Sequence, residues 1–425
     1  MDVYILDLLF IGLLLLVVTL GSGLIQRLPL SYALIYLAVG VGLGPYGLGV
    51  LQLQPNYAFL ERLTELVVIV SLFSCGLKMN RPLKLPCWRA TLRLILGLMP
   101  ISIVAIALVA HYALGFSLGA AVLLGAILAP TDPVLASEVQ LKHGDHDNLR
   151  FALTSEGGLN EALAFPFVYF GLRWFEENRW QSWIFDWVRV DVVWAIAAGI
   201  AMGAAIALSI MWLERWFHKL HPIDDLMEDF IAISLILLTY SLTELVNGYG
   251  FLSVFVAGVV VARRSYSPDR QLSQLEFTEQ MEKLLEVGTI LILGSLLRIE
   301  PIFLYGQSAL LIIGLLFFVI RPVGTWLSTW GMGQINNPDL RLHNLTRWLL
   351  GWFGIRGVGS LYYLSYALSH GAPATAASPL IWITYLTVVL SVVLHGISAT
   401  PLMTWYERRN ARHQQTPEVA CMPRR

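Results

Sequence analysis

An aspartate between two prolines interrupts an otherwise apolar stretch of this chain. Asp132 lies in the run Gly125–Val134, flanked by Pro130 and Pro133. Each proline removes a backbone N–H donor and disturbs a helix, so we expect the chain to be unwound around the acid. An ionised carboxylate in the middle of a membrane costs on the order of 3 kcal/mol or more. Secondary transporters build ion sites from acids in broken helices, so the motif predicts an ion-coupled transporter.

A second acidic motif follows in the next apolar segment, within Thr154–Phe167. Glu156 and Asn160 are four residues apart and share a helix face. Glu161 lies about 140° around the helix from Glu156, so the two acids point to different neighbours. The pair Gly157–Gly158 allows another backbone to approach closely. Two unpaired, ionised acids inside one span are costly, so we expect a cation of the protein to hold one and leave the other free for chemistry.

Two arginines inside apolar segments are candidate partners for these acids. Arg356 lies in the glycine-rich run Gly351–Ser360, and Arg321 precedes a proline in the apolar run Phe317–Gly324. Arginine does not deprotonate in proteins and therefore suits a permanent ion pair. We predict a structural pair between Glu156 and Arg356, with Arg321 meeting Glu286 or an unwound carbonyl. The glycines around Arg356 also predict a second irregular crossing.

The composition agrees with a membrane protein. Of 425 residues, 56% are hydrophobic and 13% are charged, against about a quarter charged in an ordinary soluble domain. The net charge of -1 indicates no nucleic-acid partner. No His-Glu-x-x-His or Gly-x-Ser-x-Gly motif occurs, so we expect neither an enzyme nor a cofactor. The first apolar run, Val3–Leu24, lacks a basic leader and is interpreted as a retained span.

The apolar segments predict about 13 transmembrane helices and no soluble domain. The expected spans are Val3–Leu24, Leu30–Leu51, Tyr57–Leu77, Leu92–Tyr112, Leu118–Val139, Phe151–Leu172, Val192–Leu213, Phe230–Leu245, Phe251–Ala262, Leu284–Leu297, Phe303–Leu327, Trp348–Leu368 and Leu380–Met403. The turn residues Asn247–Gly250 divide the eighth span from the ninth. We therefore expect a transmembrane domain over residues 1–406 and a short, disordered cytoplasmic tail over residues 407–425.

The basic residues set the expected orientation. With thirteen spans, alternate connections and the tail collect 21 of the 28 lysines and arginines, and the opposite side receives Arg173, Arg179, Arg189 and Arg298. Arg62, Arg321 and Arg356 lie inside spans. This is the positive-inside pattern, with the N-terminus outside and the C-terminus in the cytoplasm of a plasma (bacterial inner) membrane. The longest outer connection carries Trp180, Trp183 and Trp187 on one helix face, which favours an amphipathic helix at the membrane interface.

Together these motifs resemble the monovalent cation:proton antiporter-1 family, the sodium/proton exchangers. The resemblance rests on Thr131-Asp132-Pro133, on Glu156 with Asn160-Glu161, and on Gly354-Ile355-Arg356-Gly357, and it spans about residues 30–404. It implies an all-α antiporter fold with inverted repeats and two broken helices, a homodimer, and exchange of Na⁺ or K⁺ for H⁺, a role in pH homeostasis. By resemblance, Asp132 and Glu161 bind the transported cation or proton, and Thr131 and Asn160 complete the site. Glu156 and Arg356 match the structural ion pair of the family, and Asn160 implies electroneutral exchange.

Two departures from the family pattern bear on ion preference. Glu161 replaces the usual aspartate and reaches one methylene further, and Ser74-Cys75-Gly76 stands where some relatives carry an acid. The main alternative is a channel-like potassium efflux protein of the same fold, but no repeated carbonyl filter occurs in the sequence. His395 is interpreted as a hydrogen-bonded bundle histidine, with pH sensing as its alternative.

Overall fold

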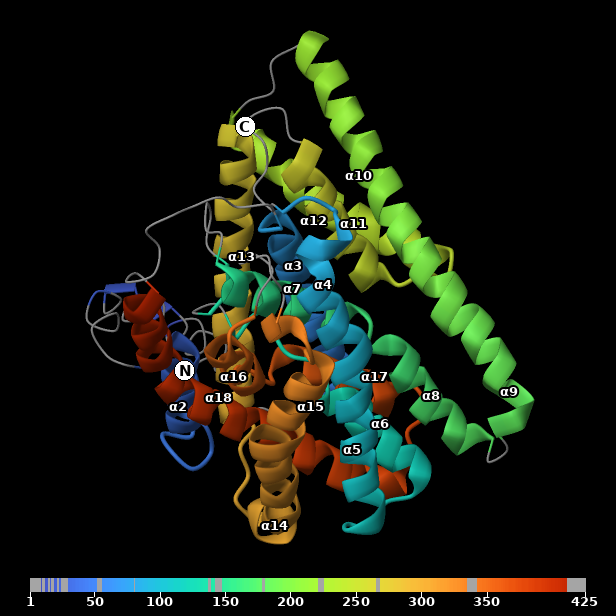
Figure 1. Ribbon diagram of the computed structural model, residues 1–425. Coiled ribbons are helices and arrows are strands. Elements are labelled where there is room, and N and C mark those ends of the chain that lie inside the picture. Colours follow the sequence, from blue (N-terminus) through green and yellow to red (C-terminus); the bar gives the residue numbers. More distant parts are fainter. Residues whose placement is uncertain are drawn as a thin grey trace.

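The computed structural model describes residues 30–51, 56–79, 81–136, 139–141, 147–177, 180–220, 225–264, 268–334 and 342–410, with a few positions between 9 and 23. Every element within these ranges is a helix (Figure 1). This confirms the prediction of an all-α protein. The expected first span, Val3–Leu24, falls mostly outside the described residues.

The helices of the first half run from α2 to α10. Their bounds are α2 Tyr32–Leu43, α3 Tyr57–Leu77, α4 Leu85–Arg93, α5 Met99–Tyr112, α6 Leu118–Leu128, α7 Asn148–Ala162, α8 Phe165–Glu176, α9 Trp180–Asp186 and α10 Ala195–Leu220. A π-helical turn, Leu94–Leu98, joins α4 to α5, and another, Trp187–Trp194, joins α9 to α10.

The second half continues with longer elements. Their bounds are α11 Asp225–Leu245, α12 Gly250–Arg264, α13 Pro268–Ser295, α14 Glu300–Leu315, α15 Arg321–Ser328, α16 Asn344–Trp352, α17 Val358–Ser369 and α18 Ala374–Asn410. The π-helical turn Leu316–Ile320 joins α14 to α15. Among the described residues, four continuous helices are long and apolar enough to cross a membrane unaided: Leu85–Tyr112, Gln181–Leu220, Glu300–Ser328 and Ala374–Arg409.

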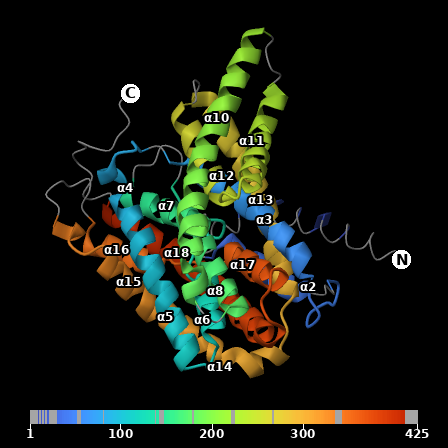
Figure 2. The same cartoon turned by 90° about the vertical axis from the view of Figure 1, so that its right-hand side faces the viewer.

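The helices pack as two groups. The first group consists of α2, α3 and α10–α13, and the second of α4–α8 and α14–α18 (Figures 1 and 2). Contacts between the groups run mainly through α3 against α17, α7 against α3 and α12, and α2 against α18. The boundary between the groups therefore passes through the middle of the molecule, and α7 and α17 lie along it.

Most predicted spans have a matching helix or helix pair. The third span agrees with α3 at both ends, Tyr57 and Leu77. The division of the eighth span from the ninth is confirmed, because α11 and α12 are separate helices. Asn247, between them, has φ of 54°, a left-handed turn conformation that asparagine tolerates better than most residues.

The tryptophan-rich connection differs from the expected separate interfacial helix. Residues Gln181–Leu220 form one continuous helix, so α9 is the beginning of the α10 crossing (Figure 1). Trp183 is buried, with its ring 5.0 Å from that of Phe170 on α8. The Trp187 indole N–H donates to Pro166 O at 2.7 Å. These two tryptophan side chains therefore pack against α8. Because they are not free to contact the membrane interface, they do not hold this helix along the membrane surface.

The last helix extends slightly beyond its expected end. We expected the tail to begin at residue 407, whereas α18 continues to Asn410; residues 411–425 lie outside the described part of the chain. Glu407 forms an ion pair with Arg150 on α7. The Tyr406 hydroxyl donates to Asp147 Oδ2 at 2.9 Å. These contacts hold the end of α18 as helix against the beginning of α7.

Candidate functional site

Two interrupted helices meet at Asp132. Helix α6 ends at Leu128 and the chain leaves helical geometry before Asp132, and residues 353–357 separate α16 from α17 without helical structure. The Asp132 backbone N–H donates to Ile355 O at 2.9 Å, so the two non-helical segments bond to one another. Both predicted helix breaks are therefore present. Buried non-helical backbone needs such partners, because no water is available at membrane depth.

The Asp132 carboxylate is enclosed by backbone donors. Asp132 is buried, with 2% of its surface exposed. Oδ1 accepts hydrogen bonds from Val134 N at 2.7 Å and Leu135 N at 3.3 Å, and Oδ2 accepts from Val358 N. Val358 is the first residue of α17, so the carboxylate also lies at the positive end of a helix dipole. A buried negative charge is thus supported without a basic side chain.

Asn160 connects α7 to the segment that holds Asp132. Its Oδ1 accepts from Thr131 N at 3.2 Å, and its Nδ2 donates to Thr131 Oγ1 at 2.9 Å. The two bonds use both ends of the amide and fix Thr131 beside Asp132. The structure therefore brings together the predicted residues Thr131, Asp132 and Asn160.

Glu161 is buried, and its carboxyl group stands without hydrogen bonds in the described ranges. It is 1% exposed, and neither carboxyl oxygen has a partner within the described part of the chain. A Cβ added at Gly359 would lie 1.6 Å from Glu161 Oε1, and one at Gly357 would lie 2.1 Å from Asp132 Oδ2. The two carboxylates therefore both face the first turn of α17, where Gly357 and Gly359 make room for them.

The predicted ion pair between Glu156 and Arg356 is wrong; Glu156 pairs with Arg321. Arg321 Nη1 donates to Glu156 Oε1 at 2.9 Å and Nη2 to Oε2 at 3.1 Å, a bidentate geometry. Nη2 also contacts Leu350 O at 3.2 Å and Phe353 O at 3.4 Å, so the expected contact with an unwound carbonyl is confirmed.

The reason for the different pairing lies at the end of α16. Helix C-termini leave carbonyl oxygens without partners, and a guanidinium satisfies them. A Cβ at Gly354 would lie 2.1 Å from Arg321 Cδ, so the glycine lets the arginine reach across the break. Arg321 thereby hydrogen-bonds at the same time to the Glu156 carboxylate and to carbonyl oxygens at the C-terminal end of α16.

Arg356 supports the second break by its backbone. Its N–H donates to Ser391 Oγ at 2.8 Å, while its fully buried guanidinium has no hydrogen-bond partner in the described ranges. His395 Nδ1 lies 3.2 Å from Ser391 Oγ, and Nε2 lies 3.0 Å from Trp352 O. His395 is hydrogen-bonded within the bundle, in agreement with the first of its two interpretations.

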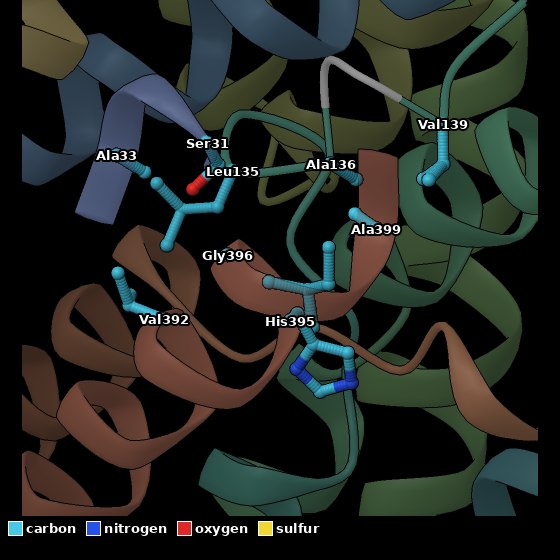
Figure 3. Close-up of a pocket in the computed structure, with 10 residues that line it drawn as sticks. Ser31, Ala33, Leu135, Ala136, Val139, Val392, His395, Gly396 and Ala399 are labelled. Carbon is cyan, nitrogen blue, oxygen red and sulfur yellow. The ribbon is translucent and has the colours of Figure 1, made fainter. Parts of the chain in front are cut away.

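A small pocket lies next to the crossing (Figure 3). His395 and Val392 on α18 line it together with Leu135 and Ala136, which follow Asp132 in the chain. The lining is mainly apolar, and its polar groups Ser31 and His395 already have hydrogen-bond partners. Cations are bound in proteins by oxygen ligands, so this pocket is a poor candidate for the cation site.

Several residues at the site were not anticipated as such. Gly357 and Gly359 could have been found from their i, i+2 spacing after Arg356, because closely spaced glycines mark a close approach. Tyr363, whose hydroxyl donates to Glu161 O, carries no sequence signal beyond an apolar helix. The choice of Arg321 over Arg356 depends on the path of the chain, which spacing alone does not encode.

An all-helical, apolar bundle with buried carboxylates at crossed, broken helices is the architecture of a secondary ion transporter. Residues 12–405 match the family described as "Sodium/hydrogen exchanger, transmembrane", and the chain belongs to this family.

Named relatives agree with this membership. The chain is 26% identical over 386 residues to the Na(+)/H(+) antiporter ApNhaP of Aphanothece halophytica, covering 89% of this chain and 69% of the relative. It is 23% identical to the K(+)/H(+) antiporter NhaP of Alkalimonas amylolytica, covering 94% and 67%. The sodium proton antiporter MjNhaP1 of Methanocaldococcus jannaschii has the same fold, with a TM-score of 0.68 at 18% identity over 95% of this chain and 99% of that one.

Proposed function

We propose that this protein exchanges Na⁺ or K⁺ for protons across a membrane by alternating access, with cation and proton competing at Asp132 and Glu161. The observation that carries the proposal is the pair of buried carboxylates at the helix crossing, 2% and 1% exposed. A carboxylate at this depth requires neutralisation, which a proton or an oxygen-ligated cation supplies. Because both neutralise the same group, one displaces the other.

The charge balance supports electroneutral exchange. The acids at the crossing are Asp132, Glu156 and Glu161, and the arginines are Arg321 and Arg356, the second of which lies within electrostatic range of Arg321 and Glu156. With all five groups charged, the empty site carries one net negative charge. One monovalent cation or one proton cancels that charge, so either form crosses at a similar electrostatic cost.

The oxygen atoms available suit a monovalent cation. Glu161 offers two carboxyl oxygens without partners among the described residues, and its charge interacts with that of Asp132. The Thr131 hydroxyl lies beside Asp132 in the chain, held by Asn160. Asn160 holds Thr131 in position through two hydrogen bonds. In this proposal Glu156 is a structural group, since both its oxygens are occupied by Arg321.

The proposal includes the surroundings of the site. The protein lies in a plasma (bacterial inner) membrane as a homodimer, as the family resemblance implies. Its N-terminus is outside and its C-terminus is in the cytoplasm, as the distribution of basic residues indicates. The transporting domain includes α18 to its end at Asn410, on the cytoplasmic side. Crosslinking in native membranes, with protease access from each face, tests both the dimer and the orientation.

Transport by purified protein in liposomes tests the central proposal. A ΔpH is imposed, and Na⁺, K⁺ and Li⁺ fluxes are measured with the net current. We expect cation-dependent proton movement without net current, and a loss of at least about tenfold for Asp132→Asn. Glu276→Gln, an exposed acid on α13, is the charge-matched control. Full exchange by Asp132→Asn would contradict the assignment.

If the protein were instead a potassium efflux channel, the transport measurements would differ. A channel would give a conductance far above carrier rates and no saturable counterflow. The nearly complete burial of both carboxylates favours a carrier, since a conducting path needs hydrated access from both sides.

A further inference from the structure

A second polar cluster lies between the crossing and one end of the molecule. On α3, Ser71 and Ser74 face α13, and Lys78 follows one turn later at the end of the helix. On α13, Glu279 and Glu282 are three residues apart and share a face. All five side chains belong to the first helix group, on the side of the basic connection between α3 and α4.

The cluster holds two separate sets of hydrogen bonds, one between Ser71 and Glu282 and one around Lys78, and the second is a network that reaches the site. Ser71 Oγ donates to Glu282 Oε1 at 3.0 Å. Lys78 Nζ donates to Glu279 Oε1 at 2.9 Å and to Gln140 Oε1 at 2.7 Å. The Gln140 amide in turn donates to Pro133 O, next to Asp132. The network therefore joins the first helix group to the segment that carries the site.

The charges of the cluster do not cancel. Glu282 is 5% exposed and Lys78 is 9% exposed. The one positive charge of Lys78 interacts with both Glu279 and Glu282, so one of the two negative charges is left over. Within the described part of the chain, the hydrogen-bond partner of the Glu282 carboxylate is the Ser71 hydroxyl. An uncompensated buried carboxylate is costly unless it is neutralised.

Two buried polar groups without partners point to a ligand here. The Ser74 hydroxyl is fully buried, has no hydrogen-bond partner among the described residues, and faces the Glu282 carboxyl. The carboxyl oxygens of Glu161 are also unpartnered, and the charges of Glu161 and Glu282 interact. Other titratable groups facing the cluster are Cys75 and Lys78 on α3 and Glu279 on α13.

We propose that Glu282, with the hydroxyls of Ser71 and Ser74, forms a second holding position for the transported monovalent cation, on the path between the Lys78 end of the molecule and the Asp132–Glu161 site. A cation at this position neutralises Glu282 and takes the free oxygens as ligands. Lys78 limits the occupancy to one cation by keeping Glu279 paired. The inference rests on the proposed function and adds an entry step on one side only.

Transport kinetics measured from each side test the inference. Glu282→Gln keeps the shape of the side chain and removes its charge. We expect the apparent KM for Na⁺ or K⁺ on the Lys78 side to rise by about fivefold or more, and the KM on the other side to stay within about twofold. Glu276→Gln on the same helix removes one exposed charge and should leave both values unchanged. Equal changes on the two sides would overturn the proposal.

A double variant separates cation binding from a merely structural role. If Glu282 only balances Lys78, the pair Lys78→Gln with Glu282→Gln should restore the wild-type KM. If Glu282 holds the cation, the double variant keeps the raised KM on the Lys78 side. Ser71→Ala and Ser74→Ala should raise the same KM by a smaller factor, with thermal unfolding recorded to exclude misfolding.

The inference and the proposed function fail in distinguishable ways. Wild-type protein without any cation–proton exchange would refute the proposed function. Normal exchange by wild-type protein, with an unchanged KM on the Lys78 side in Glu282→Gln, would refute the second holding position alone.

Discussion

Asp132 and Glu161 are both buried acids, yet their surroundings differ. Asp132 accepts hydrogen bonds from three backbone N–H groups, whereas the Glu161 carboxylate accepts none in the part of the chain that is described. Fixed donors favour a carboxylate in its charged form. In the proposed mechanism Asp132 is therefore the pre-organised anion, and Glu161 is the adaptable group that depends most on an incoming ion.

Adding one methyl group at Gly359 should disturb transport more than stability. In Gly359→Ala the new Cβ would meet Glu161 Oε1, the mobile end of a side chain, so the carboxylate shifts away while the helix remains. We expect exchange to fall by at least about tenfold, with a similar melting temperature. Gly314→Ala on α14, where nothing lies within 4 Å, is the control. Unchanged transport by Gly359→Ala would remove Glu161 from the site.

For the Glu156–Arg321 ion pair we predict the opposite kind of effect, a loss of stability. Both side chains are almost fully buried, at 2% and 1% exposed, so Arg321→Ala leaves a buried carboxylate without its partner. Such a loss costs about 3–5 kcal/mol of unfolding free energy. Arg62→Ala removes an exposed pair with Glu65, worth less than about 1 kcal/mol. Chemical or thermal unfolding in detergent should show a large loss for Arg321→Ala alone.

At the scale of helices, glycines set how closely α3 and α12 pack. A Cβ at Gly76 would lie 2.4 Å from Phe255 O, and one at Gly258 would lie 2.5 Å from Phe73 O. The two backbones therefore touch directly, as small residues allow in membrane bundles. This contact fixes the position of the face of α3 that carries Ser71 and Ser74.

Gly76→Ala should force α3 and α12 apart. Because the obstacle is backbone, the strain cannot be relieved by a side-chain rotation, and we expect a loss of about 1–3 kcal/mol in unfolding free energy. Gly288→Ala on α13 meets nothing within 4 Å and should be neutral or slightly stabilising, since alanine favours helix. A stability equal to wild type in Gly76→Ala would contradict the close contact.

The same elements indicate what the sequence could predict. The ends of α3 follow from its apolar run, and the break before Asp132 follows from its flanking prolines. The partner of Glu156 did not follow, because Arg321 reaches it across the open end of α16, a contact between residues 165 positions apart. Glu282 was also missed, since the expected span began at Leu284 and α13 begins earlier, at Pro268.

At the scale of the whole molecule, the two helix groups are joined by polar contacts on one side of the crossing and by aromatic contacts on the other. Towards Lys78, polar bonds through Gln140 connect them. Towards the connection 246–249, the contacts are aromatic: the ring of Phe165 on α8 lies 5.5 Å from that of Tyr249 and 5.3 Å from that of Phe251. Transport by alternating access requires one group to move against the other, so each set of contacts must break in turn.

Weakening the aromatic contact should make the site more accessible from that side. Phe165→Leu keeps an apolar side chain but removes the ring that bridges the groups, which raises the population of the state open towards residues 246–249. Apparent affinity scales with the fraction of competent state, so the KM on that side should fall, by about fivefold if the open state is rare. Phe317→Leu, an equally buried ring that lies 5.2 Å from that of His395 on α18, within the second group, is the matched control. Equal KM changes on both sides would show that Phe165 only stabilises the fold, whereas a one-sided fall would identify the aromatic contact as the closure of the transport path.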